Sequence, residues 1–366
     1  MIANLPAGIR SRLVESINGL TMHVLEAGDA GRPGVLLLHG FPELAYSWRK
    51  IMLPLAQGGY HVIAPDQRGY GRTTGWDSGY DADWGACRAL NLARDALGLV
   101  HALGLKSVAA VVGHDFGAMV AAWSALVRPD VFKSLVLMSA PFAGPPAIQA
   151  NPGVPSTKQL NEQLGALNPP RKHYQWYYGT READADMRRC PQGVHAFLRA
   201  YFHHKSADWA ANKPEPLASW AAAEMARMPT YYIMERDKNM AETVAAEMPS
   251  GPGAWLTEEE LRVYSTEYER TGFQGGLNWY RCRLGGRFTA DEQLYAGRSI
   301  DVPARFIAGR SDWGIYQRPG DIDRMQRIAC SRMAAPLLVD GAGHWVQQEQ
   351  PEAVTRALLE FLRGSA

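Results

Sequence analysis

One short stretch, centred on Asp115, constrains the fold of this chain more than any other. Val111 to Ala118 reads VVGHDFGA. This pattern indicates a β-strand that ends in Gly-x-Asp-x-Gly and turns directly into a helix. The glycines permit the strained turn that raises one side chain above the end of a sheet. A serine is usual at the raised position, and here a carboxylate replaces it. The stretch therefore predicts an α/β sheet with a nucleophile at the carboxyl end of a strand.

The carboxylate at position 115 determines which bonds such a nucleophile can break. A serine that attacks a saturated carbon leaves an ether, which water does not readily remove. A carboxylate that attacks the same carbon leaves an ester, which an activated water can hydrolyse. Asp115 therefore indicates alkyl transfer to the protein rather than acyl transfer.

Length, charge and cysteine usage narrow the class of protein. The 366 residues suit one large domain with a sizeable insertion, or two domains. A formal net charge of +1 gives no electrostatic reason to expect nucleic acid or an anionic membrane surface as a partner. The four cysteines are scattered without a CxxC pair, so we expect no disulfide framework or zinc site and favour a reducing cytoplasm. Neither a secretory signal nor an apolar run of ~18 residues is present, so we expect no membrane insertion.

The pattern of apolar runs divides the chain into three parts. We expect strands at 21–26, 34–39, 61–65, 108–112, 133–139, 302–308 and 336–339, and helices at 89–103, 194–207, 217–228, 257–272 and 351–363. Residues 1–141 and 299–366 then form an α/β core with a mostly parallel sheet flanked by helices. Residues 142–298, rich in Pro, Trp, Tyr and Met, form an inserted and mainly helical cap that roofs an apolar site.

A carboxylate nucleophile needs a base and a group that orients the base, and both candidates follow it in the sequence. His344 lies in a glycine-flanked loop after a predicted strand, and Asp312 lies just past an earlier one. Asp340, at the start of the histidine loop, is a rival for the acid. The other usual place for the acid follows the strand near Ser139, where the next carboxylate is Glu162. We therefore expect the catalytic set Asp115, His344 and Asp312.

Backbone N–H groups are expected to stabilise the oxyanion that forms when the ester is hydrolysed. The loop HGFPE at 39–43 follows the first buried strand, so the N–H of Phe41 can point at the site. The N–H of Phe116, the residue after the nucleophile, is its expected partner. The run Asp66–Arg68 is expected to be structural, because an Arg near loop carboxylates usually ties loops together.

Together these residues resemble the epoxide hydrolase branch of the α/β-hydrolase superfamily, over nearly the whole chain. The stretches that carry the resemblance are HGFPE (39–43), DQRGYG (66–71), GHDFGA (113–118), GHW (343–345) and GFQGGLNWYR (272–281). The first three are also found in haloalkane dehalogenases. The last stretch lies in the expected cap and discriminates between the two families.

The resemblance implies two cap tyrosines that hold the epoxide oxygen. Tyr280, in the NWYR segment, matches one of them, and Tyr174 matches the other. Tyr177 and Tyr178 lie about one helical turn from Tyr174 and stay open as alternatives. Four further aromatic residues are expected to line the substrate pocket: Trp176, Tyr178, Trp279 and Trp345.

The chemistry of the leaving group separates the two closest functions. Opening an epoxide generates an alkoxide that needs a proton, which paired tyrosines supply. Expelling a halide needs N–H donors instead, and Phe116 stands where an indole is frequent in the family. We therefore expect an epoxide hydrolase that uses a small apolar epoxide and water and needs neither a metal nor an organic cofactor. A haloalkane dehalogenase and a non-catalytic small-molecule-binding protein on the same scaffold are the alternatives, and a homodimer stays open.

Overall fold

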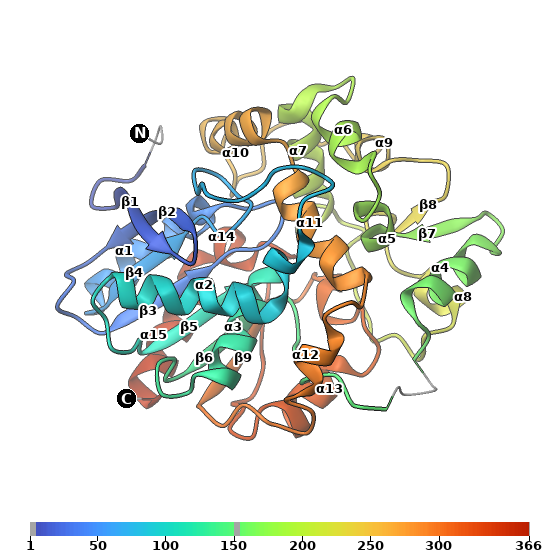
Figure 1. The fold of residues 1–366 in the computed structure, drawn as a ribbon. Helices are drawn as coiled ribbons and strands as arrows, with labels where there is room; N and C mark the ends of the chain where they lie inside the picture. The colour runs from blue at the N-terminus through green and yellow to red at the C-terminus, as the bar shows by residue number, and fades with distance from the viewer. Residues whose placement is uncertain (1–4, 150–153, 366) are drawn as a thin grey trace.

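The computed structural model describes residues 5–149 and 154–365, and its centre is an eight-stranded sheet with the strand order β1-β2-β4-β3-β5-β6-β9-β10. Figure 1 shows this sheet with helices on both sides. β1 (Arg10–Ile17) and β2 (Leu20–Ala27) form an antiparallel pair, and β2 is also antiparallel to β4. All the later neighbours in the sheet run parallel. The expected α/β fold with a mostly parallel sheet is confirmed.

The parallel strands fall close to the apolar runs of the sequence. They are β3 (Gly34–Leu38), β4 (His61–Pro65), β5 (Ala110–His114), β6 (Leu135–Met138), β9 (Ala304–Gly309) and β10 (Leu337–Val339). The helices that cover them are α1 (Arg49–Gln57), α2 (Ala89–Ala102), α3 (Phe116–Val127) and α15 (Pro351–Ser365). β5, the strand before Asp115, begins and ends two residues later than the strand predicted at 108–112.

β3 packs into two hydrophobic cores, one on each face of the sheet, which explains why it is apolar at every position. In β3, Leu36 and Leu38 pack into one core with residues of α2 and α3. Val35 and Leu37 point to the opposite face and pack with residues of α1 and α15. Because successive side chains of a strand alternate between faces, a strand buried on both sides shows a continuous apolar run.

Between β6 and β9 the described residues add no strand to the main sheet. We refer to residues 142–298 as the cap segment. Its helices are α4 (Thr157–Gly165), α5 (Tyr174–Tyr178), α6 (Ala183–Arg188), α7 (Gly193–His204), α8 (Ala222–Met225), α9 (Met240–Ala245), α10 (Glu258–Thr271), α11 (Gln274–Leu284) and α12 (Thr289–Gln293). β7 (Arg171–His173) and β8 (Ile233–Glu235) form a separate two-stranded sheet that was not expected from the sequence. In Figure 1 most of this segment lies above and to the right of the main sheet.

Two local predictions differ from the structure. The helix predicted over 217–228 is wrong over most of its length, because only Ala222–Met225 is helical. Ala221 is extended, and Pro229 disfavours the helical conformation of the residue before it. β1 was not expected, because this edge strand exposes most of its side chains and shows no apolar run.

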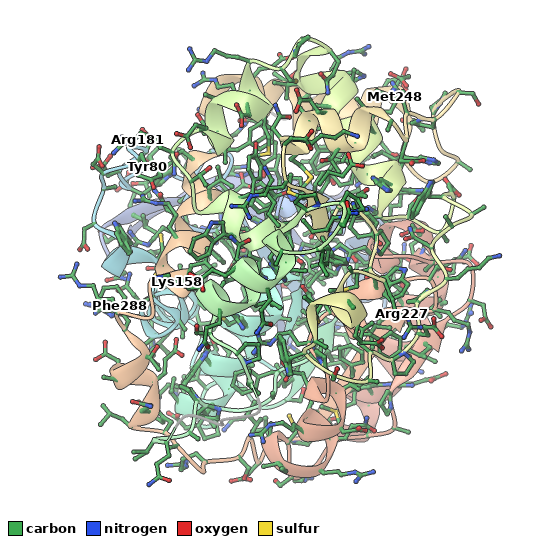
Figure 2. All side chains as sticks on the ribbon, turned by 90° about the vertical axis from the view of Figure 1, so that its right-hand side faces the viewer. Tyr80, Lys158, Arg181, Arg227, Met248 and Phe288 are labelled. Carbon is green, nitrogen blue, oxygen red and sulfur yellow. The ribbon has the colours of Figure 1, made fainter. Side chains whose placement is uncertain are left out.

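Ion pairs tie the cap segment to the rest of the molecule. Arg181 of the cap segment pairs with Asp81 at 2.6 Å and lies over the Tyr80 ring, 4.2 Å from its centroid (Figure 2). Arg49 of α1 donates from Nε to Glu260 of α10 at 2.9 Å, and this arginine is almost fully buried. One exposed and one buried ion pair therefore join the cap segment to the region after β4 and to α1.

The structure also bears on membrane insertion. Among the described residues, no helix combines the length and the apolar character needed to cross a bilayer.

Candidate active site

Asp115 occupies a strained turn between β5 and α3. Its backbone has φ 51° and ψ −121°, a conformation that non-glycine residues adopt rarely. A Cβ atom on Gly113 would lie 2.2 Å from the carbonyl oxygen of Gly117, and one on Gly117 would lie 2.2 Å from that of Leu38. Both positions therefore require glycine, because the turn packs backbone against backbone. The result is a carboxylate raised above the end of the sheet.

His344 lies between Asp115 and Asp312. Its Nε2 atom is 3.2 Å from Oδ2 of Asp115, and its Nδ1 atom is 3.1 Å from Oδ1 of Asp312. The three side chains come from the ends of β5, β10 and β9, and all are buried, with Asp115 8% exposed. The rival acid, Asp340, instead forms an ion pair with Arg310 at the surface. The structure thus brings together the three residues that the sequence grouped.

The surroundings of the two carboxylates favour their ionised forms. Burial opposes ionisation of Asp115, but the hydrogen bond and charge of His344 outweigh it, and the pKa of Asp115 lies far below its ordinary value. Burial likewise opposes ionisation of Asp312, and His344 together with the N–H of Gly314 at 2.7 Å lowers its pKa. Both groups are therefore charged at neutral pH, as a nucleophile and an orienting acid must be.

The expected oxyanion donors flank the nucleophile. The N–H of Phe41 donates to Oδ1 of Asp115 at 3.0 Å. Phe116 is the first residue of α3, where backbone N–H groups have no partner within the helix. Gly40 permits the approach, because a Cβ atom at this position would lie 2.4 Å from Cβ and Oδ1 of Asp115.

A buried ion pair beneath the site was missed from the sequence. Glu43 contacts His114 at 2.5 Å, accepts from the N–H of Gly40 at 3.0 Å and accepts from Gln347 at 2.9 Å. Nε2 of His114 lies 2.7 Å from the carbonyl oxygen of His344. Burial opposes the charge on Glu43, but His114 outweighs it and lowers the pKa of this carboxyl. The pair connects the Phe41 loop to the histidine loop. The only sign of this pair in the sequence is an acidic residue, Glu43, directly after Phe41 and Pro42.

Tyr280 and Tyr174 lie over the nucleophile from α11 and α5. The Tyr280 ring is 4.9 Å from the Phe116 ring and 6.1 Å from the Tyr174 ring, centroid to centroid. The Tyr174 hydroxyl donates to Oε1 of Gln317 at 3.2 Å. Burial, reinforced by the charge of Asp115, raises the pKa of both phenols, so both hydroxyls keep their protons. Two protonated phenols therefore lie close enough to interact electrostatically with Asp115, although the Tyr174 hydroxyl donates to Gln317 in this structure.

The alternative tyrosines have other partners. Tyr177 donates its hydroxyl to Asp186 at 2.9 Å, which directs it away from the nucleophile. Tyr178 donates to the hydroxyl of Tyr201 at 3.1 Å, while its ring packs on Tyr280 with centroids 5.0 Å apart. Tyr178 is thus beside the site, as a lining residue would be.

The three tryptophans expected to line the pocket are placed differently from one another. Trp279 packs against Phe116 at 5.3 Å, and Trp345 packs against His344 at 4.7 Å. Trp176, in contrast, is 36% exposed. Because successive helix positions point about 100° apart, the residue between the Tyr174 and Tyr178 positions faces a different side of α5. Its expected contact with substrate is therefore not supported.

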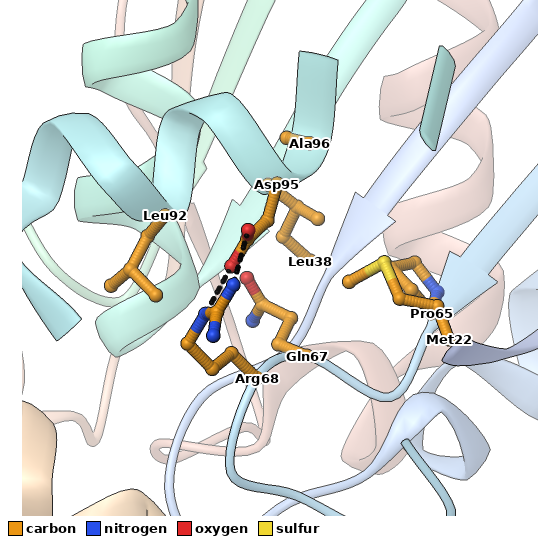
Figure 3. A pocket seen from close by; sticks show the side chains of 8 residues that line it. All are labelled: Met22, Leu38, Pro65, Gln67, Arg68, Leu92, Asp95 and Ala96. Atoms are coloured by element: carbon orange, nitrogen blue, oxygen red, sulfur yellow. Dashed lines mark hydrogen bonds and ion pairs between the residues drawn. The ribbon is translucent and has the colours of Figure 1, made fainter. Parts of the chain in front are cut away.

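Arg68 holds the loop after β4 in place. Its guanidinium forms a two-pronged contact with Asp95 of α2, at 2.7 and 2.8 Å, beside a small pocket (Figure 3). The carbonyl oxygen of Arg68 accepts a hydrogen bond from the indole of Trp279 at 3.0 Å. The loop thus supports α11, which carries Tyr280, in line with the structural role expected for this motif.

Known proteins with similar sequences and structures agree with this architecture. The alpha/beta hydrolase fold family matches residues 33–351. Epoxide hydrolase A of Mycobacterium tuberculosis is 37% identical over 96% of this chain and 97% of its own length. Epoxide hydrolase 2 of Siraitia grosvenorii is 32% identical over 95% and 96%. The crystal structure of epoxide hydrolase A from Mycobacterium thermoresistibile has a TM-score of 0.79 and 34% identity over 98% of this chain and 99% of that one. The chain belongs to the α/β-hydrolase fold family and, within it, to the epoxide hydrolases.

Proposed function

We propose that this protein hydrolyses a small apolar epoxide to a vicinal diol through a covalent ester on Asp115. The observation that carries the proposal is that one site combines a carboxylate that has lost its proton with two phenols that keep theirs. Asp115 is kept ionised by His344, and Tyr174 and Tyr280 above it are kept protonated. The relatives at 32–37% identity are themselves named epoxide hydrolases.

In the first step Asp115 acts as the nucleophile. Phe41 holds Oδ1, so Oδ2 is the oxygen that attacks an epoxide carbon. The new C–O bond forms as the bond to the epoxide oxygen breaks, and the electron pair stays on that oxygen. Tyr174 and Tyr280 hydrogen-bond to it and supply a proton. The products are a hydroxyalkyl ester of Asp115 and one tyrosinate. The tyrosinate recovers its proton after ester hydrolysis, when the second proton of the attacking water leaves the regenerated Asp115 carboxyl.

In the second step His344 acts as the base. It takes a proton from water, and the water oxygen attacks the ester carbonyl carbon of Asp115. The negative charge collects on Oδ1, where the N–H groups of Phe41 and Phe116 receive it, a stabilisation of about 3 kcal/mol per donor. The acyl–oxygen bond then breaks, the diol leaves with a proton returned from His344, and Asp312 keeps the imidazole oriented.

The cap segment, residues 142–298, forms the roof of this site. It contributes both tyrosines and leaves Asp115 only 8% exposed, which excludes bulk water from the ester. Dehalogenation is disfavoured because Phe116 has no side-chain N–H and the nearby indole of Trp279 already donates to Arg68. A cytoplasmic location and a homodimer stay predictions from the sequence.

One turnover in oxygen-18 water tests the covalent step. Enzyme in excess is mixed with styrene oxide, and the peptide that contains Asp115 is analysed by mass spectrometry. We expect the label in the Asp115 carboxyl after the first turnover, because water attacks the acyl carbon. Label found only in the diol would mean direct attack by water and would rule out the ester. Full ligand affinity without any diol would favour a binding protein instead, and halide release from haloalkanes would favour a dehalogenase.

A further inference from the structure

A lysine from the cap segment is buried beside the catalytic residues. Lys205 directly follows α7 and is only 3% exposed. Its ammonium nitrogen lies among four aromatic rings, with centroids at 5.0, 5.3, 5.5 and 5.9 Å, which belong to Tyr232, Trp345, Tyr201 and Tyr231. The faces of such rings attract a cation, so the cage favours the charged form of the lysine.

The backbone around Lys205 is attached to the loop that carries the catalytic base. The N–H of His344 donates to the carbonyl oxygen of Lys205 at 2.9 Å. Glu349 accepts from the N–H of Ala207 at 2.8 Å, and it also accepts from the N–H groups of Gly343 and Trp345, both at 2.9 Å. One buried carboxyl thus joins both segments and holds the backbone of Lys205 next to that of His344.

Three buried acids interact electrostatically with the ammonium of Lys205. Burial has the largest effect on Lys205 and lowers its pKa below the ordinary value, whereas Asp115, Asp312 and Glu43 favour its charged form and offset part of that effect. Glu43 already has a partner of opposite charge in His114 at 2.5 Å. Oδ2 of Asp312, in contrast, is buried and has no hydrogen-bond partner among the described residues. The charge of Asp312 is therefore the one most in need of a cation nearby.

We propose that Lys205 is a positioning residue for the second chemical step, whose charge balances Asp312 so that His344 is free to act as a neutral base. The inference rests on the proposed function. Once Asp115 is esterified it has lost its charge, and Asp312 is the acid in contact with His344. A buried carboxylate alone would favour the imidazolium, which cannot take a proton from water. The nearby ammonium opposes that effect.

The groups that face these two residues come from several elements. Around Lys205 they are Asp115 after β5, Asp312 after β9, Glu43 after β3, His204 and Tyr201 on α7, and Tyr231 and Tyr232 before β8. Around His344 they are Asp115, Asp312, His114 and, through the flanking N–H groups, Glu349. Because Glu43 and His114 balance each other, removing the lysine charge changes the balance at Asp312 most.

The test compares Lys205→Met with Lys213→Met, which alters an exposed lysine of the same segment. Methionine keeps an unbranched apolar stem that suits an aromatic cage, so we expect the variant to fold. Formation and hydrolysis of the styrene oxide ester are followed separately by rapid quench and mass spectrometry from pH 6 to pH 9. In Lys205→Met we expect ester formation within about twofold of wild type. The rate of ester hydrolysis falls at low pH, and in this variant the pH at which it falls should be higher by about one unit. Hydrolysis on this acid limb should then be about tenfold slower than in wild type, and it should recover near pH 9.

Further outcomes separate the inference from the proposed function. Lys205→Arg keeps the charge, so its acid limb should match that of wild type, and Lys205→Gln gives a second neutral variant if methionine fails to fold. Wild-type turnover combined with an unshifted limb in the neutral variants would overturn the role of Lys205, as would equal slowing at every pH. A wild-type enzyme that forms no ester would instead reject the proposed function itself.

Discussion

The backbone N–H of Phe41 donates a hydrogen bond of 3.0 Å to Oδ1 of Asp115 before any substrate is bound. The same donor is therefore in place for the oxyanion that develops on Oδ1 when the ester is hydrolysed. Such preorganisation removes the need to reorient dipoles during the reaction. It also assigns different tasks to the two carboxylate oxygens, because Oδ2 alone faces His344.

The first prediction concerns the loop that delivers this donor. In Gly40→Ala the new Cβ would lie 2.4 Å from the Asp115 side chain, so the carboxylate must move. We expect kcat/KM for styrene oxide to fall by about 100-fold, since small displacements of reacting groups have effects of that size. Gly251→Ala meets open space and serves as the control. Unchanged kinetics in Gly40→Ala would contradict the geometry of the loop.

The second prediction concerns the base. His344→Gln should leave ester formation measurable and slow ester hydrolysis by at least about 100-fold, because no group remains to take the proton from water. Mass spectrometry of the intact protein after mixing with styrene oxide should show a persistent adduct equal to the mass of the epoxide. Rapid disappearance of the adduct would exclude His344 as the base.

The third prediction separates the cap tyrosines. Tyr280→Phe and Tyr174→Phe should each slow ester formation about tenfold or more, because the alkoxide loses a proton donor. Tyr177→Phe should change it by less than about twofold, since this hydroxyl donates to Asp186. The measurement is the single-turnover rate of ester formation. If Tyr177→Phe gave the large effect and Tyr174→Phe the small one, the assignment of Tyr174 would be wrong.

The fourth prediction concerns stability and pH at a site outside the catalytic centre. Burial opposes ionisation of Glu26, but hydrogen bonds to His61 and Arg12 outweigh it and lower the pKa of Glu26 to about 2. A carboxyl whose pKa is lower in the folded state stabilises the protein above its unfolded pKa, near 4.5, and loses that contribution as the pH falls towards 2. Glu26→Gln should therefore reduce the free energy of unfolding by roughly 1–2 kcal/mol at pH 7, after allowing for solvent screening.

Urea unfolding of Glu26→Gln at several pH values checks this expectation. The difference from wild type should shrink as the pH falls from 4.5 towards 2, because Glu26 of the unfolded chain is protonated before Glu26 of the folded protein. Glu15→Gln, on the exposed face of β1, is the control and should differ from wild type by less than about 0.5 kcal/mol at every pH. A difference that stays constant with pH would show that the charge of Glu26 is not responsible.

Local sequence patterns predicted the residues of the site that directly follow strands of the parallel sheet. The nucleophile, acid and base follow strands whose apolar runs are visible in the sequence, so their meeting at one edge of the sheet follows from parallel pairing. The roles of Glu43 and Lys205 depend instead on partners far away in the chain. Glu43 meets His114 and Gln347, and Lys205 meets the histidine loop, and no local pattern encodes such meetings.

Two departures from the sequence predictions have local causes. Trp176 is 36% exposed because a helix directs neighbouring positions to different sides, so its predicted place in the pocket gains no support. The short α8 replaced a predicted helix of twelve residues because Pro229 and an extended Ala221 limit it.

The pairing of β6 with β9 has a consequence for how this protein family can diversify. Leu135 to Met138 are aligned with Ala304 to Ile307, so the long segment between them leaves the sheet and returns to it at adjacent strands. β6 and β9 pair directly with each other, and no described residue of the segment between them takes part in this pairing. Insertions, deletions or wholesale exchange of the segment can therefore reshape what enters the site while the strand register and the turn at Asp115 stay the same. Because that segment also carries Tyr174 and Tyr280, substrate range and the groups that protonate the leaving oxygen can change together, while the nucleophile and its base are retained.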